Sequence, residues 1–176
     1  MKKRFVIFTA CVLLLSMVAC GEGDAQQTTP GTTVPAAPNV EVPEEPGYVF
    51  GYNGTQIPMK AEAQPILEAL GEPKSYTETA SCAFVGLDKT YFYGSFYLTT
   101  CPIEDKDYIY GLWLVDDTVT TAEGLYIGAS QADVERIYGT EGYNGSNGYI
   151  LTKGACRLTI ILEEGLVSSI QYDAVF

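Results

Sequence analysis

The sequence contains no histidine. Histidine is the commonest general base and a frequent metal ligand, so its absence excludes a Ser-His-Asp triad and a Cys-His pair. The chain also has no P-loop and no Gly-x-Gly-x-x-Gly motif after a predicted strand. We therefore expect no enzymatic activity, no cofactor and no metal site, and we predict no catalytic residue.

Basic residues are scarce. The 176 residues include 10 Lys+Arg against 22 Asp+Glu, a net charge of −12, and three of the basic residues are Lys2, Lys3 and Arg4 at the N-terminus. The rest of the chain is therefore strongly acidic. Such a charge repels nucleic acids and anionic lipid surfaces, so we predict no nucleic-acid partner.

A long hydrophobic run is also missing, since Phe5–Leu15 is shorter than the ~20 residues needed to span a bilayer. A basic start, an apolar stretch and a small residue before a break are typical of a secretory signal, here residues 1–19. Cys20 directly follows Ala19, which resembles a bacterial lipoprotein signal whose cysteine is lipidated, for example with palmitate. This resemblance implies lipid anchoring at the extracytoplasmic face of the cell membrane. An ordinary signal peptide cleaved nearby is the alternative.

Residues 20–47 are rich in Pro, Thr, Ala and acidic residues and have almost no large apolar side chain. Such a segment cannot offset its ordering entropy by burial, so we predict a disordered tether. All 13 tyrosines and the only tryptophan follow residue 47. We predict one folded domain at 48–176.

Beyond Cys20 the chain has an odd number of cysteines, Cys82, Cys101 and Cys156. Cys82 and Cys101 are the closest pair in sequence and could form one disulfide if the geometry permits. Three free thiols are the alternative.

One helix signal occurs twice. Ser130 is a predicted N-cap, Asp133 occupies the capping-box position and Gly139 is a predicted stop, which gives a helix at 130–138. Residues 57–71 align with this region at an offset of 68 positions and give a second helix at 61–70, with Pro65 in its first turn. We predict two tandem repeats, at about 57–117 and 125–173.

Each helix precedes segments rich in aromatic and β-branched residues, which are typical of strands. The predicted strands are 89–93, 96–101, 108–116, 149–153, 156–162 and 166–173. Residues 75–86 are ambiguous and could hold an extra strand, and residues 102–107 are predicted as a polar loop. The pattern predicts an α+β fold of two tandem helix-plus-antiparallel-meander repeats, with the helices on one face of the sheet.

Turn lengths predict the strand register. A two-residue turn at Gly154-Ala155 places Leu151 opposite Leu158, and a three-residue turn at 163–165 places Leu158 opposite Ile170. Since these residues are apolar, we assign them to the core face. The same register in the first repeat places Tyr91, Leu98 and Leu112 on the core face.

The other face of the sheet then carries two rows. These are Phe92, Tyr97 and Trp113 in the first repeat, and Thr152, Arg157 and Gln171 in the second. Exposed aromatic patches mark contact sites, and Tyr and Trp are frequent interface anchors. We predict that Phe92, Tyr97, Trp113, Arg157 and Gln171 bind a partner. Alternatively, the aromatic residues are core, covered by 48–50 or 75–86, and a one-residue register slip would exchange the faces.

Two acidic clusters, 104–107 and 116–117, remain. Dense carboxylates could bind Ca²⁺, and paired carboxylates could hydrolyse glycosides, but the EF-hand spacing is absent. An exported domain that binds a small ligand, a glycan or calcium through these loops, or a weak hydrolase, is therefore the alternative function.

The repeated motif, Ile127-Gly-Ala-Ser-Gln-Ala-Asp-Val134 with Gly139, resembles the β-lactamase-inhibitor-protein-like fold and is similar to small outer-membrane assembly lipoproteins. Residues 81–89 and 116–124 are similar to uncharacterised lipoproteins of gut Firmicutes. The fold resemblance implies protein binding through an exposed, concave sheet face, although no inhibitory residue carries over. We therefore expect a membrane-anchored, non-enzymatic lipoprotein that binds a protein or cell-envelope partner.

Overall fold

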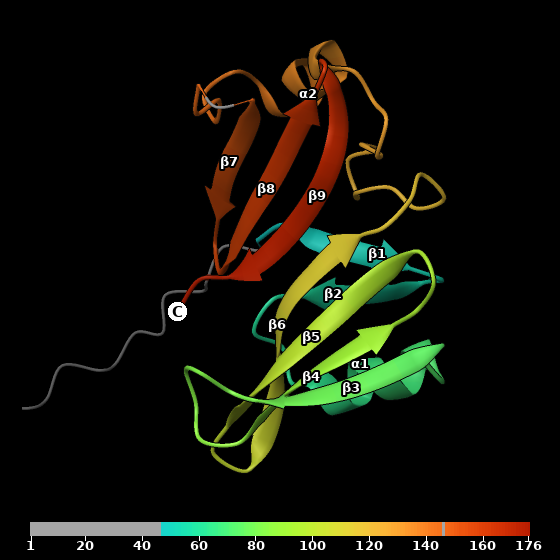
Figure 1. Ribbon diagram of the computed structural model, residues 1–176, viewed down its shortest axis with the longest axis vertical. Helices are drawn as coiled ribbons and strands as arrows, with labels where there is room; N and C mark the ends of the chain where they lie inside the picture. Colours follow the sequence, from blue (N-terminus) through green and yellow to red (C-terminus); the bar gives the residue numbers. More distant parts are fainter. Residues whose placement is uncertain (1–46, 146) are drawn as a thin grey trace, which may run out of the picture. The chain divides into compact units, whose positions relative to one another are not determined.

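The computed structural model describes residues 47–145 and 147–176 (Figure 1). The predicted signal peptide, the predicted lipidation site at Cys20 and all but the last residue of the predicted tether lie outside these residues. The described elements, in chain order, are β1 (Val49–Tyr52), β2 (Thr55–Pro58), α1 (Ala63–Leu70), β3 (Ser75–Ala80), β4 (Leu87–Phe92), β5 (Phe96–Ile103), β6 (Lys106–Leu114), α2 (Gln131–Tyr138), β7 (Gly148–Lys153), β8 (Cys156–Glu163) and β9 (Leu166–Ala174).

Most of the domain is one seven-stranded antiparallel sheet with the order β3-β4-β5-β6-β9-β8-β7, and β1 and β2 form a separate hairpin. Two meanders, β4-β5-β6 and β7-β8-β9, join where β6 pairs with β9 (Figure 1). The extra strand considered for residues 75–86 is present as β3. A predominantly antiparallel sheet with helices agrees with the predicted α+β class at this coarse level.

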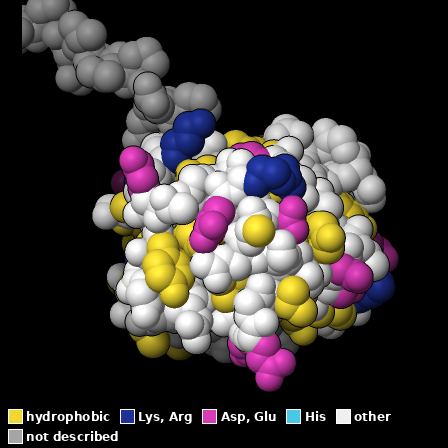
Figure 2. Space-filling view, turned by 90° about the horizontal axis from the view of Figure 1, so that it is seen from above, with side chains coloured by type: hydrophobic (Ala, Val, Ile, Leu, Met, Phe, Trp, Pro, Cys, Tyr) yellow, Lys and Arg dark blue, Asp and Glu magenta, His cyan; other side chains and the backbone are white. Residues whose placement is uncertain are grey.

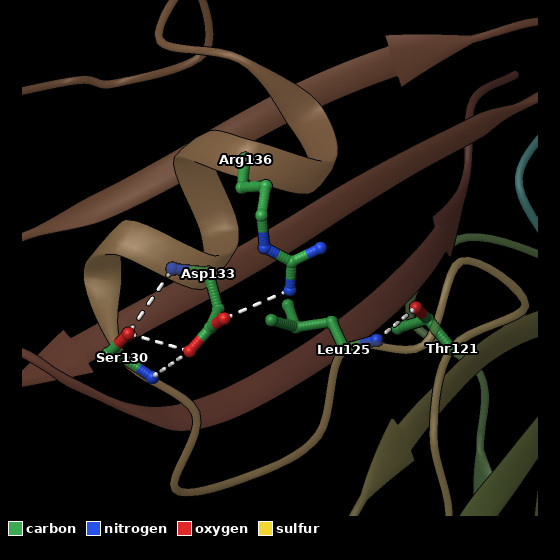
Figure 3. A network of polar contacts seen from close by, with 5 residues as sticks. All are labelled: Thr121, Leu125, Ser130, Asp133 and Arg136. Carbon is green, nitrogen blue, oxygen red and sulfur yellow. Dashed lines mark hydrogen bonds and ion pairs between the residues drawn. The ribbon is translucent and has the colours of Figure 1, made fainter.

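Helix α2 begins at a complete capping box, as predicted (Figure 3). The Ser130 hydroxyl accepts a hydrogen bond from the Asp133 N–H at 3.2 Å, and the Asp133 carboxylate accepts from the Ser130 N–H at 3.3 Å. Arg136 adds an ion pair to the same carboxylate at 2.9 Å. The helix ends at Gly139, whose φ of 79° lies in the left-handed region that favours glycine.

Helix α1 begins two residues later than predicted. Pro65 lies in its first turn, where a missing N–H breaks no intrahelical hydrogen bond. The helix buries Ala63 and Ile66 and contacts β2 and β6.

One face of the sheet forms the core. Its fully buried side chains include Leu98, Leu112, Leu158, Ile160, Ile170 and Tyr172. The β1–β2 hairpin packs on this face, because the Phe50 ring lies 5.1 Å from Phe96 and 6.1 Å from Tyr172 between centroids. The hairpin therefore lies on the face opposite the predicted aromatic row and does not cover it.

The predicted register is confirmed for Leu151 opposite Leu158, for Tyr91 opposite Leu98 and for Leu98 opposite Leu112. The prediction that Leu158 opposes Ile170 is wrong. Leu158 opposes Tyr172, because the chain turns at Glu164-Gly165 and a bulge follows between Ile161 and Leu162. The error is two residues, so the side chains from Ser169 to Asp173 stay on their predicted faces.

The predicted loop at 102–107 is also wrong. Strand β5 continues to Ile103 and β6 begins at Lys106, which leaves Glu104-Asp105 as a two-residue turn with Glu104 at φ 55°. A bulge in this hairpin makes Tyr110 an additional residue between Ile109 and Gly111.

Candidate functional site

Three aromatic side chains from consecutive strands lie in one row on the face opposite the core, which we call the open face. Phe92 opposes Tyr97, and Tyr97 opposes Trp113. The ring centroids of the first pair are 4.5 Å apart at 26°, and those of the second pair are 4.8 Å apart at 19°. All three side chains are half-buried. We call this row the aromatic ladder.

The ladder determines which ring surfaces a partner can reach. Its spacing is close to the ~4.7–4.9 Å between neighbouring strands. Tyr97 therefore stacks with one ring on each side, whereas Phe92 and Trp113 each stack with one ring. On the side of Trp113 away from Tyr97, its cross-strand neighbour is Gln171 on β9.

The polar residues predicted to share this face do lie on it, although not in the predicted row. Arg157 opposes Asp173, and Gln171 opposes Thr159, because of the bulge in the β8–β9 hairpin. Asp173 accepts a hydrogen bond from Gln171 Nε2 at 2.7 Å and forms an ion pair with Arg157 Nη2 at 3.3 Å. Asp173 thus links Arg157 to Gln171.

Asp173 was not among the predicted site residues. It follows Gln171 by two positions, and residues two apart on a strand point to the same face. This alternation along β9 is the sequence pattern from which Asp173 could have been predicted to share the face of Gln171.

A cavity of about 270 Å³ lies on the open face beside the ladder. It is lined by Thr79, Asp88, Thr90, Thr99, Tyr110, Gly111, Trp113, Gln171 and Asp173. Gly111 provides the space, because a Cβ at this position would lie 2.9 Å from Thr99 Oγ1 and 3.4 Å from the Tyr172 carbonyl oxygen. Five strands, β3, β4, β5, β6 and β9, contribute to the lining.

The cavity has a mixed polar and apolar lining that carries no basic side chain. Asp88 Oδ1 is buried and accepts no hydrogen bond from any part of the chain that the structure describes. Burial, followed by the nearby Asp88 charge, raises the pKa of the Cys101 thiol to about 11. The lining carries two carboxylates, of which Asp173 is paired with Arg157.

The chain end lies beside one wall of the cavity. The Phe176 ring stacks on Tyr110 with centroids 6.1 Å apart and meets Phe84 edge-on at 5.7 Å. Lys60 Nζ lies 4.9 Å from the centre of the Phe176 ring. The segment predicted as a possible cover, 75–86, instead extends the sheet edge as β3 and then brings Phe84 to this chain end.

Two residues of the acidic clusters considered for calcium are engaged in local contacts. Asp107 pairs with Lys89 at 2.6 Å, and Asp116 accepts hydrogen bonds from the Thr118 hydroxyl and then from the Thr118 N–H, which lower the pKa of Asp116. Within residues 47–145 and 147–176, no group of three or more His, Cys, Asp or Glu could hold a metal ion. Figure 2 shows acidic side chains spread over one face of the domain among separate hydrophobic ones.

No protein-family model matches the sequence, and no curated protein is similar to it. A solved structure with some similarity is an extracellular protein containing a SCP domain from Bacillus anthracis str. Ames, with 12% sequence identity and a TM-score of 0.40. The match covers 66% of this chain and 44% of that chain, so this chain spans less than half of its length. At this TM-score the similarity carries no argument. No helix in the described part of the chain is long and apolar enough to cross a membrane.

Proposed function

We propose that the chain is an exported lipoprotein, anchored by lipidated Cys20 to the extracytoplasmic face of the cell membrane, whose domain binds a protein or cell-envelope partner without catalysis. The main observation that supports this proposal is the aromatic ladder on the open face. The helices and the β1–β2 hairpin pack on the other face, so the ladder remains accessible at Phe92, Tyr97 and Trp113.

The polar groups beside the ladder support binding rather than chemistry. Interfaces combine aromatic anchors with a polar rim that provides hydrogen bonds and specificity. Here Arg157, Gln171 and Asp173 form a connected set next to Trp113. Because Asp173 fixes both neighbours, the rim is ordered before a partner arrives, which reduces the entropic cost of binding.

The proposal includes a duplicated origin and a relationship to the β-lactamase-inhibitor-protein-like fold. Its support is that a helix precedes each three-stranded meander and that both meanders open with a two-residue turn, at Gly94-Ser95 and at Gly154-Ala155.

Site-specific photocrosslinking tests the contact surface. A photoreactive aromatic residue replaces Tyr97 in the full-length chain, expressed in its native host. We expect a crosslinked adduct to an envelope component at this position. The matched control is Tyr126, an exposed tyrosine that lies outside the ladder. Equal adducts at both positions, or none at Tyr97, would contradict binding through the open face.

Replacement of the lipidation site tests the anchor. Cys20→Ser is expected to move the full-length chain from the membrane fraction to the medium or the soluble extracytoplasmic fraction, because a stable lipid anchor requires the acylated cysteine. A Cys20→Ser chain that stays in the membrane fraction would exclude this anchor.

A further inference from the structure

The cavity beside Trp113 has a composition that selects for the chemistry of its ligand. Its lining includes three threonine hydroxyls, one glutamine amide, two carboxylates and two aromatic rings, with no Lys or Arg. An anionic ligand would face Asp88 and Asp173 without a compensating cation in the lining, so the cavity disfavours phosphates and carboxylates.

Asp88 and Asp173 supply the charged acceptors of the cavity, because both side chains line it. An ionised carboxylate only accepts hydrogen bonds, so these two residues favour a ligand that carries donors such as hydroxyl groups.

Trp113 and Gly111 define the shape of the cavity. Trp113 contributes an aromatic ring to the wall of the cavity, and the missing side chain of Gly111 opens the floor between Thr99 and Asp173. A ring with one apolar C–H face and hydroxyls on its edge, as in a pyranose, fits such a wall with a polar rim. The volume of about 270 Å³ lies just below the ~300–1,000 Å³ of sites for drug-sized ligands, so it accommodates one sugar ring of a longer chain.

A cationic ligand fits less well. An alkylammonium group would satisfy the carboxylates but would leave the hydroxyls of Thr79 and Thr90 without a partner that both donates and accepts, whereas the Thr99 hydroxyl already donates to the Gly111 carbonyl. Hydroxyl groups do both. The polar rim therefore favours a neutral polyhydroxyl ligand over a lysine side chain.

We propose that the cavity is a saccharide subsite, in which one pyranose ring of a neutral oligosaccharide stacks on Trp113 and donates hydroxyl hydrogen bonds to Asp88 and Asp173. This inference rests on the proposed function, since it identifies a glycan as the envelope partner of the open face.

Titration of the full-length chain with chitotetraose, cellotetraose and maltotetraose, followed by NMR chemical shifts, tests the subsite. At least one oligosaccharide is expected to shift the Trp113 indole signal and those of its neighbours, with saturable binding. Trp113→Ala is expected to weaken binding by about tenfold or more, because a stacked aromatic contact is worth about one such factor.

Asp88→Ala provides a second variant in case Trp113→Ala fails to fold. It is expected to raise the melting temperature, since it removes an unpartnered buried acceptor, and to reduce the affinity at least about fivefold. The matched control is Asp117→Ala, which removes an exposed carboxylate outside the cavity and is expected to leave the affinity unchanged.

The outcomes separate the subsite from the proposed function. If no oligosaccharide binds at millimolar concentration while Tyr97 photocrosslinking still traps an envelope protein, the saccharide subsite is wrong and binding through the open face stands. Binding of Nα-acetyl-lysine methylamide without saccharide binding also overturns the subsite, because the ligand would be a cation. If saccharides bind and both cavity variants retain full affinity, the site lies elsewhere and the inference fails.

Discussion

Trp113 on β6 lies directly opposite Gln171 on β9, at the pairing that joins the two meanders. The free end of the aromatic ladder therefore meets the polar residues of the second meander. Neither meander alone presents both an aromatic ring face and the Gln171–Asp173–Arg157 set. A contact surface on the open face thus depends on correct β6–β9 pairing.

A double-mutant cycle tests the ladder. Tyr97→Ala and Trp113→Ala are expected to couple by about 0.5–1.5 kcal/mol in the free energy of unfolding, since their rings stack. Phe92→Ala and Trp113→Ala are expected to be additive within about 0.5 kcal/mol, because Tyr97 separates the two rings. Urea denaturation measures both cycles. Equal coupling in the two cycles would contradict a stack with Tyr97 in the middle.

Neighbouring residues on β5 test the assignment of the two faces. Leu98 is fully buried on the core face, so Leu98→Ala is expected to cost about 2–5 kcal/mol in the free energy of unfolding. Thr99 points to the open face and donates one hydrogen bond, to the Gly111 carbonyl at 3.2 Å, so Thr99→Ala is expected to cost about 0.5–1.5 kcal/mol. Chemical denaturation compares the stabilities of the two variants. A larger loss for Thr99→Ala than for Leu98→Ala would contradict the assignment of the core face.

Local patterns in the sequence predicted much of the fold. The Ser130–Asp133 capping box depends on residues three apart, and the row of Phe92, Tyr97 and Trp113 depends on strand alternation and short turns. These features are set by near neighbours in the chain. The β8–β9 bulge was missed because the two serines at 168–169 carry no apolar signal that would mark the shift in alternation between Val167 and Ile170.

Other features were missed for different reasons. The β1–β2 hairpin carries the strong turn signal Asn53-Gly54, and both residues have positive φ. The hairpin was not predicted because the first repeat was expected to begin near Ile57. The cavity could not be predicted, since it requires Gly111 on β6 to lie beside Asp173 on β9. That pairing joins segments about 60 residues apart, and alternation along single strands does not determine it.

Acid titration tests the start of α2. Hydrogen bonds from the Ser130 side chain, then from Arg136 and the Ser130 N–H, lower the pKa of Asp133 to about 2 from 3.8. A lowered pKa in the folded state means that the ionised carboxylate stabilises the fold above pH 3.8 and that this contribution is lost as the pH falls towards 2. The difference in stability between the wild type and Asp133→Asn is expected to shrink over this range.

The control for this titration is Asp117→Asn. Asp117 has no side-chain hydrogen bond or ion pair with the described residues, so its variant is expected to show no comparable pH-dependent difference. NMR titration of the Asp133 carboxyl carbon measures the pKa directly. A midpoint near 4 would contradict the capping box in solution.

The three cysteines are expected to differ in reactivity. The structure has all three as free thiols, with Cys82 exposed and Cys101 and Cys156 buried. Burial, together with the nearby charge of Asp173, raises the pKa of Cys156 to about 12, and burial with the charge of Asp88 raises that of Cys101 to about 11. Since the thiolate is the reactive form, Cys101 and Cys156 are protected at neutral pH both by burial and by protonation.

Differential alkylation measures this order. Iodoacetamide at neutral pH is expected to modify Cys82 in the native chain, and Cys101 and Cys156 only after guanidinium denaturation, without a reductant. A Cys82–Cys101 disulfide, the alternative left open by the sequence, would instead leave both residues unmodified in guanidinium until a reductant is added. Because Cys156 is alkylated after unfolding in either case, it serves as the internal control, and peptide mapping of the other two cysteines decides between the two states.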